Sequence, residues 1–122
     1  MMILIAEGMH PEGIRRLKDA GFSIVQIHEP HNSALVTVLV VRSVFQVNAA
    51  FLDQYPNITI VAKLGTGIDN IDEYVCRSRD ITVINAPAMN AISTAEFAVT
   101  QIVGITKRVY EIYDRVRNND LR

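Results

Sequence analysis

The chain has 122 residues, 49% hydrophobic and 20% charged, a composition that predicts one compact domain, residues 1–122, with a core of its own. Twelve basic residues stand against thirteen acidic ones without a basic block, so nucleic acid is not an expected partner. No apolar run approaches the about 18 residues of a membrane span, and the apolar start is too short for a signal peptide, so we expect a cytoplasmic protein without a membrane partner.

Five short apolar runs predict β-strands. They cover residues 2–6, 22–27, 36–41, 58–63 and 81–84. Val, Ile and Leu fill these runs almost without interruption, which is typical of a parallel sheet whose two faces are both covered by helices. Helical stretches alternate with the strands, so the sequence predicts an α/β fold with a doubly wound sheet.

Amphipathic stretches between the strands predict helices at 11–20, at about 46–55 and at 70–78. Pro11 opens the first of these helices, and Gly21 closes it. Asn70 and Glu73 have the spacing of a capping box, so we expect the third helix to begin at that pair.

A last, longer helix is expected to run without interruption to about residue 118. Ser93 and Glu96 have the spacing of a second capping box and mark its start. Its first half is nearly all apolar or small, which suits a buried position. Its second half carries a narrower apolar stripe of Val109, Ile112 and Val116, which predicts a partner surface.

Neither the single cysteine nor the three histidines predict a metal site. Cys76 cannot form an internal disulfide and is interpreted as a packed thiol. His28 and His31 are the first and last residues of "HEPH", but a bound metal needs at least three converging ligands on a fixed backbone. His10 follows the first strand and is expected to border the ligand cleft.

In an open α/β sheet, ligands collect beyond the carboxyl ends of the strands. The residues expected there are Glu7 and Gly8, Arg42 and Ser43, Gly65 to Gly67, and Asn85 to Pro87. A phosphoryl-accepting receiver domain would need acidic residues after its first and third strands to hold magnesium. The third strand ends in Arg42, which argues against that class.

The turn "GTG" at residues 65–67 is not a dinucleotide fingerprint. Asn70 stands where a third glycine belongs, and no acid follows about 20 residues on to bind a ribose. The backbone N–H groups of Gly65, Thr66 and Gly67 would suit a carboxylate or a phosphate. The alternative is a tight turn that needs glycine only for its backbone dihedrals.

The stretch "GTGIDNID", followed by "INAPAMNAISTAEFAV", resembles the substrate-binding domain of the D-isomer-specific 2-hydroxyacid dehydrogenases, nearest to the phosphoglycerate dehydrogenase branch. "HPEGIRRLKDAGF" and "VVRS" extend the resemblance over nearly the whole chain. It implies a flavodoxin-like domain that packs across a cleft from a Rossmann domain, which holds NAD and carries the catalytic Arg, Glu and His. Because that second domain is absent from this sequence, we expect a chain that cannot catalyse alone and that binds NAD weakly or not at all.

The resemblance also implies roles for individual residues. The backbone of Gly65, Thr66 and Gly67 would lie against the substrate carboxylate, and Thr66 would also reach the cofactor. Arg42 and Ser43 would line the end of the pocket that receives the polar tail of the substrate, and Asn90 would face the reacting carbon. Independently of the resemblance, the planar fork of an arginine can pair an anion in two places.

Three features depart from the family. Lys63 and Leu64 stand where Arg-Ala often precedes the glycines, and Met89 is expected to narrow the pocket. Only residues 28–35 join the second and third strands, where the family inserts a helix and a parallel crossover normally takes ten or more residues. Either this helix is lost or the second strand is displaced, and we expect a partly uncovered sheet face or edge.

The sequence leaves two functions open. The first is the substrate-binding domain of an NAD-dependent D-2-hydroxyacid dehydrogenase that binds a small anionic 2-hydroxy acid. The second is a free-standing binding or assembly module that has lost the dehydrogenase chemistry. The equivalent of the final helix forms a two-fold dimer contact in the family, so the resemblance implies a homodimer.

Overall fold

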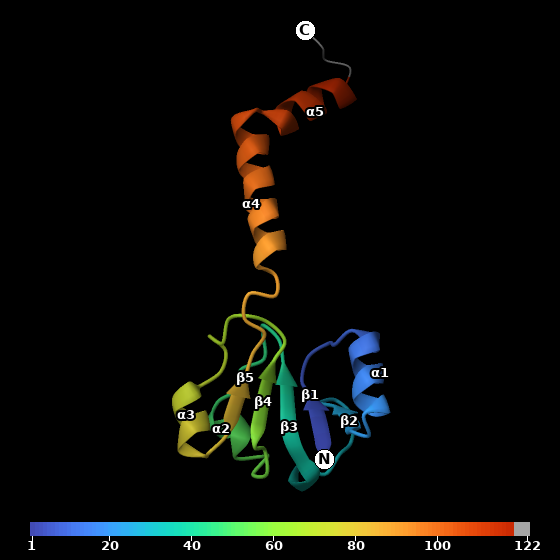
Figure 1. Cartoon of the computed structure of the whole chain (residues 1–122), viewed down its shortest axis with the longest axis vertical. Helices are drawn as coiled ribbons and strands as arrows, with labels where there is room; N and C mark the ends of the chain where they lie inside the picture. Colours follow the sequence, from blue (N-terminus) through green and yellow to red (C-terminus); the bar gives the residue numbers. More distant parts are fainter. Residues whose placement is uncertain (119–122) are drawn as a thin grey trace. The chain divides into compact units, whose positions relative to one another are not determined.

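The computed structural model describes residues 1–118, which form two compact units, 1–87 and 88 onward. The first unit contains a parallel sheet of five strands in the order β2-β1-β3-β4-β5 (Figure 1). The strands are β1 Met2–Ile5, β2 Ser23–Gln26, β3 Val36–Val41, β4 Ile60–Lys63 and β5 Thr82–Ile84. All five predicted strands are therefore confirmed, and the unit has the predicted α/β, flavodoxin-like fold.

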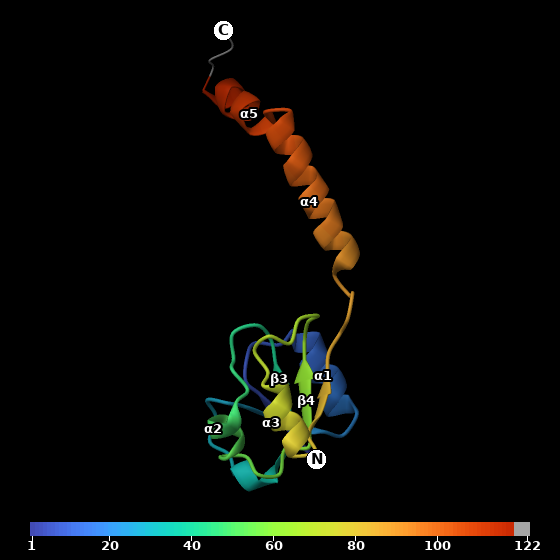
Figure 2. The same cartoon turned by 90° about the vertical axis from the view of Figure 1, so that its left-hand side faces the viewer.

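Helices cover both faces of this sheet. Helix α1, Pro11–Asp19, lies on one face, and α2, Ala49–Leu52, and α3, Glu73–Ser78, lie on the other (Figure 2). One core cluster contains Ile3, Ile5, Val38 and Val40, and the larger cluster on the opposite face is centred on Leu4, Leu39 and Val61. Successive residues of each central strand are thus buried on alternate faces, which explains their almost unbroken apolar sequence.

The first helix begins and ends where the sequence predicts. His10 is its N-cap residue, and Pro11 occupies the first helical position. After the helix, Gly21 adopts φ 84°, a left-handed conformation that glycine accepts at little cost.

Helix α3 begins later than predicted, and the Asn70–Glu73 capping box is wrong. Asp72 is the N-cap, and its side chain accepts a hydrogen bond from the Val75 N–H at 3.0 Å. Residues 69–70 form a turn, and Ile71 then pairs with Val47 in an isolated parallel β-bridge, so the helix cannot start at Asn70. Helix α2 is also shorter than predicted, at four residues, and is capped by Asn48.

The connection between β2 and β3 contains no α-helix. A single 3₁₀ turn, Ser33–Leu35, replaces it, and β2 keeps its place beside β1, so the first of the two predicted alternatives holds. The expected partly uncovered sheet face or edge stays a prediction. The rings of Phe45, Phe51 and Tyr55 pack in a row, and His31 stacks on Tyr55 at 5.8 Å between ring centroids.

The second unit contains two helices where one was predicted. They are α4, Ala91–Thr106, and α5, Val109–Arg117. Arg108 has φ 55°, which ends the helical path between them. The hydroxyl of Tyr110 donates to Gln101 Oε1 at 2.9 Å, and its ring fills the space beside Gly104, where a Cβ atom would lie 2.8 Å from it.

Two further expectations about this segment are wrong. Helix α4 starts at Ala91, so Ser93 and Glu96 lie inside it and do not form a capping box. Gly104 is the only buried residue of α4, and the apolar side chains of its first half are exposed. Between residues 1 and 118, no helix is long and apolar enough to cross a membrane.

Candidate functional site

A carboxylate fixes the loop that follows β3. Glu7, just after β1, accepts hydrogen bonds from the backbone N–H groups of Arg42, of Ser43 at 3.2 Å and of Val44 at 3.0 Å. Burial alone would raise the pKa of Glu7, but the backbone donors of residues 42–45 outweigh it and hold this pKa below its ordinary value. The loops after β1 and β3 are therefore joined through an ionised carboxylate.

A buried polar pair supports the same loop from β4. Lys63 and Asn70 are 8% and 6% exposed, and the Lys63 ammonium donates to Asn70 Oδ1. The amide group of Asn70 donates in turn to the carbonyl oxygens of Arg42 at 3.2 Å and Phe45 at 2.6 Å. The buried Lys63–Asn70 pair thus fixes the backbone of the loop that carries Arg42.

The Gly65–Gly67 turn is tied to the loop after β5. The Gly65 carbonyl accepts from the Ala86 N–H at 3.0 Å, and the Asn85 side chain donates to the Thr66 carbonyl at 2.8 Å. The hydroxyl of Thr66 donates to the Ala86 carbonyl at 3.3 Å. The Gly65 N–H is used inside the turn, on the Lys63 carbonyl at 2.9 Å, whereas the Gly67 N–H has no partner among residues 1–118.

The glycines of this turn are not needed for their dihedrals. Gly21 is the only described glycine with a positive φ, so the backbone at Gly65 and Gly67 is open to other residue types. A Cβ atom at Gly67 would lie 3.1 Å from the Asp69 carboxylate, and one at Gly65 would lie 3.6 Å from Lys63 Cε. The geometry therefore does not support a turn that needs glycine for its dihedrals. It favours the reading in which the two glycines keep side chains away from the backbone N–H groups of the turn.

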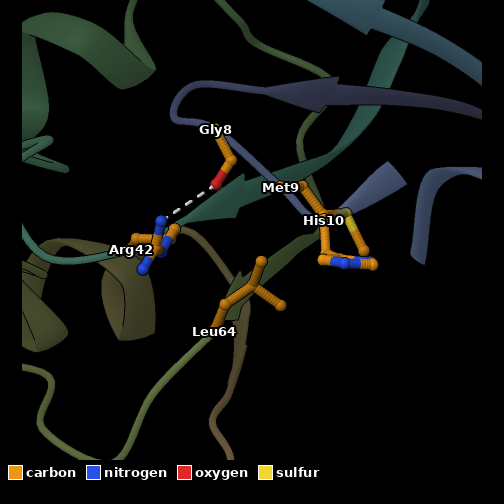
Figure 3. A pocket seen from close by; sticks show the side chains of 5 residues that line it. All are labelled: Gly8, Met9, His10, Arg42 and Leu64. Carbon is orange, nitrogen blue, oxygen red and sulfur yellow. Dashed lines mark hydrogen bonds between the residues drawn. The ribbon is translucent and has the colours of Figure 1, made fainter. Parts of the chain in front are cut away.

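A pocket of about 490 Å³ opens beside these loops (Figure 3). Its lining residues are Gly8, Met9, His10, Arg42 and Leu64. Arg42 Nη1 donates to the Gly8 carbonyl at 3.3 Å, which places the guanidinium at the wall of the pocket. His10 borders the pocket as expected, whereas Ser43 is not among the lining residues and contributes its N–H to Glu7.

Two lining residues were not predicted from the sequence. Met9 packs against α1, where the position of a Cβ at Gly13 would be only 2.6 Å from Met9 Cε. Leu64, which directly precedes the glycines, is 40% exposed. The departure of Leu64 from the family pattern was visible in the sequence, but its exposure in the pocket was not.

The predicted residues beyond Pro87 belong to the second unit. Asn90 is the N-cap residue of α4, although its side chain makes no capping hydrogen bond to the helix, and Met89 is exposed. Their roles at the reacting carbon and in narrowing the pocket stay predictions.

The histidines of "HEPH" have structural surroundings. His31 Nδ1 lies 2.7 Å from the Glu29 carbonyl oxygen, and its Nε2 lies 3.0 Å from the Tyr55 hydroxyl. Within the described part of the chain, no group of three His, Cys, Asp or Glu side chains could hold a metal ion. Cys76 is buried, as predicted, and burial, with the negative charge of Asp72, raises the pKa of its thiol.

The residues of the first unit do not fit a dinucleotide on their own. At the position of a third glycine stands Asn70, whose buried side chain is fully engaged with Lys63 and the loop after β3. Helix α3 starts only at Glu73 and has six residues, so the turn does not open directly into a helix that could receive a pyrophosphate.

The sequence matches the family model for the D-isomer specific 2-hydroxyacid dehydrogenase, catalytic domain, over residues 3–118. The chain therefore belongs to the D-isomer specific 2-hydroxyacid dehydrogenase family. This agrees with the resemblance seen in the sequence.

Individual relatives support this assignment. A D-3-phosphoglycerate dehydrogenase from Archaeoglobus fulgidus is 30% identical over 115 residues, covering 89% of this chain and 22% of that protein. An (S)-sulfolactate dehydrogenase from Chromohalobacter salexigens is 36% identical over 85 residues, covering 70% of this chain and 28% of that protein. The chain thus corresponds to roughly a quarter of the length of these relatives.

A solved structure confirms the fold. The D-lactate dehydrogenase of Aquifex aeolicus, complexed with NAD and lactic acid, matches with a TM-score of 0.86 at 21% identity. The match covers 100% of this chain and 38% of that chain.

Proposed function

We propose that this chain is the substrate-binding domain of an NAD-dependent D-2-hydroxyacid dehydrogenase of the phosphoglycerate dehydrogenase type. It holds a 2-hydroxy or 2-oxo acid and does not catalyse alone. The observation that carries the proposal is the pocket at the carboxyl edge of the sheet, which Arg42 and Leu64 line (Figure 3). The Gly65–Gly67 turn directly follows Leu64 in the chain. Acidic side chains are absent from its described lining.

The substrate carboxylate would bind at the turn, with the Gly67 N–H as a donor. Arg42 would bind the other end of the substrate, since a guanidinium pairs phosphate, sulfonate or carboxylate oxygens two at a time. The relatives from Archaeoglobus and Chromohalobacter are named for phosphoglycerate and sulfolactate, both of which carry a second anionic group. We therefore propose a 2-hydroxy acid with an anionic group at C3 as the substrate class.

NAD would accept the hydride from C2 when bound to the complete enzyme. The residues of this chain orient the acid for that transfer: the turn fixes the carboxylate, Arg42 fixes the tail, and Asn90 is proposed to face C2. Thr66 is proposed as the one contact of this chain with the cofactor.

Amide chemical-shift mapping with D-3-phosphoglycerate tests the proposal. We expect millimolar binding, because one cation and a few N–H groups in an open pocket supply only about 4 kcal/mol. Shifts should concentrate at residues 65–67 and 42–43, and Arg42→Ala should abolish them. Arg79→Ala is the matched control, since Arg79 lies outside the pocket in an ion pair with Asp53. Shifts confined to another surface would contradict the assignment.

A specific observation favours the second candidate, an assembly module. Helices α4 and α5 expose a series of large apolar side chains. They include Ile92, Phe97, Ile102, Ile105, Ile112 and Val116. A surface of this kind is typical of protein contacts. The two functions are compatible if the substrate-binding domain also forms the subunit contact.

A further inference from the structure

The pocket has a second polar side chain, opposite Arg42. We propose that His10 is a specificity-determining residue, which donates a hydrogen bond from Nε2 to the anionic C3 group of the acid. This inference rests on the proposed function and adds to it the residue that distinguishes an acid with a charged tail from one without. In Figure 3, Arg42 and His10 lie on either side of Leu64.

The N-cap role of His10 fixes its tautomer. Its Nδ1 accepts a hydrogen bond from the Glu12 backbone N–H at 3.2 Å. A ring nitrogen that accepts carries no proton, so the proton of the neutral imidazole is on Nε2. Within residues 1–118 this Nε2 has no partner, and the His10 side chain is exposed. Because the helix cap occupies Nδ1, the Nε2–H group of the neutral ring is available as a donor to a ligand.

The charges around the pocket favour an anion. Both oxygens of Glu7 are directed to backbone N–H groups of residues 42–44, and the carboxylate of Glu12 pairs with Arg15 and Arg16. Neither acid therefore faces the pocket as a free acceptor. Arg42 uses Nη1 on the Gly8 carbonyl and keeps further N–H groups for a ligand.

Arg42 and His10 line the same pocket, so both donors are available to a ligand that occupies it. Leu64 also lines this pocket and offers an apolar contact for the C3 methylene group (Figure 3). A phosphate or sulfonate has three charged terminal oxygens and can accept charge-assisted hydrogen bonds from both side chains at once, whereas a hydroxymethyl tail offers one neutral oxygen and a methyl tail offers none. The affinity difference between charged and uncharged tails should therefore depend on His10.

The test compares His10→Ser with the parent chain. Serine retains the N-cap acceptor for the Glu12 N–H but has no distal ring nitrogen, so α1 is preserved while the donor is removed. Dissociation constants are measured by amide shift titration at fixed ionic strength for D-3-phosphoglycerate and for D-glycerate, which lacks the phosphate. His28→Ser is the matched control, because His28 is exposed and does not line the pocket.

We expect His10→Ser to weaken D-3-phosphoglycerate binding about tenfold, the loss of one hydrogen bond to a charged group, and to leave D-glycerate binding unchanged. In the parent chain, the Nε2 resonance of His10 should shift with phosphoglycerate only. Equal affinities of parent and variant for phosphoglycerate, with shifts still at Arg42, would overturn the role of His10 and leave the proposed function intact. An absence of shifts at residues 42 and 65–67 in the parent would overturn both.

Discussion

The backbone N–H groups of the loop after β3 donate to the Glu7 carboxylate, as they would donate to a neighbouring strand if β3 continued. Changing Glu7 to Gln keeps the shape but removes the charge and one acceptor. We expect a loss of about 1–3 kcal/mol in the free energy of unfolding at pH 7, measured by urea denaturation. Glu12→Gln is the control, because Glu12 is exposed on α1 and its ion pairs are screened by solvent, so this change should alter the stability less than Glu7→Gln does.

The effect of Glu7 should depend on pH in a defined direction. Its folded-state pKa is lowered, so its stabilisation is fully present above the ordinary glutamate pKa and is lost as the pH falls through the folded-state value. The difference between parent and Glu7→Gln should therefore shrink in acid. A constant difference from pH 7 to pH 3 would contradict the assignment.

The Lys63–Asn70 pair should behave as one unit. Asn70→Leu leaves the buried Lys63 ammonium and the carbonyls of Arg42 and Phe45 without their amide partner, and we expect a loss of about 2–4 kcal/mol in stability. The double variant Lys63→Met with Asn70→Leu should recover part of this loss. A double-mutant cycle with no coupling energy would show that the two side chains act independently.

Asn70 also shows why single residues were assigned wrongly from sequence. Asparagine before a helix satisfies the capping-box pattern, and the same side chain is equally able to bridge two loops. The choice depends on the long-range pairing of Val47 with Ile71, which local spacing does not report. By residue type alone, Asp72 is an equally good cap.

At the level of elements, the spacing of apolar residues could not predict where the final helix ends. Apolar residues continue at helical spacing across residues 105–112, yet Arg108 turns the chain. The turn is stabilised by Tyr110, which reaches back to Gln101 and Gly104 of α4. Only the absence of a side chain at Gly104 makes room for the ring, and this is a contact between helices, not a local preference.

Although the predicted helix is divided in two, the apolar stripe remains, and it lies on α5. Val109, Ile112 and Val116 are 47%, 56% and 53% exposed. We predict that the chain forms a symmetric homodimer through α4 and α5 at micromolar concentration, because association would bury the apolar side chains that these helices expose. Sedimentation velocity measures it, and Val109→Asp with Ile112→Asp should produce a monomer.

The control for this dimer is Tyr74→Asp, which adds a charge at an exposed ring of α3 in the first unit. A parent chain that sediments as a monomer would rule the homodimer out. So would a double aspartate variant that dimerises with unchanged affinity.

At the level of the whole molecule, the fold could be predicted because the same sequence pattern, an apolar run followed by a helical stretch, occurs several times. Five apolar runs separated by helical stretches leave few arrangements other than a parallel sheet, and the carboxyl edge follows from that topology. Arg42 and the Gly65–Gly67 turn were therefore placed on the same edge. The pocket itself could not be predicted from the sequence. Met9 lines it because this side chain packs against α1, and Leu64 lines it because its side chain is exposed.

Helix α4 has a further consequence for the energetics of the chain. It buries only Gly104, and α5 buries none of its residues. An isolated helix of 16 residues is marginal in water, because nucleation is costly and most helical stability comes from packing. The amide protons of β1 and β3 should therefore exchange with solvent deuterium at a rate independent of protein concentration, while those of residues 91–117 should become protected only as copies of the chain associate.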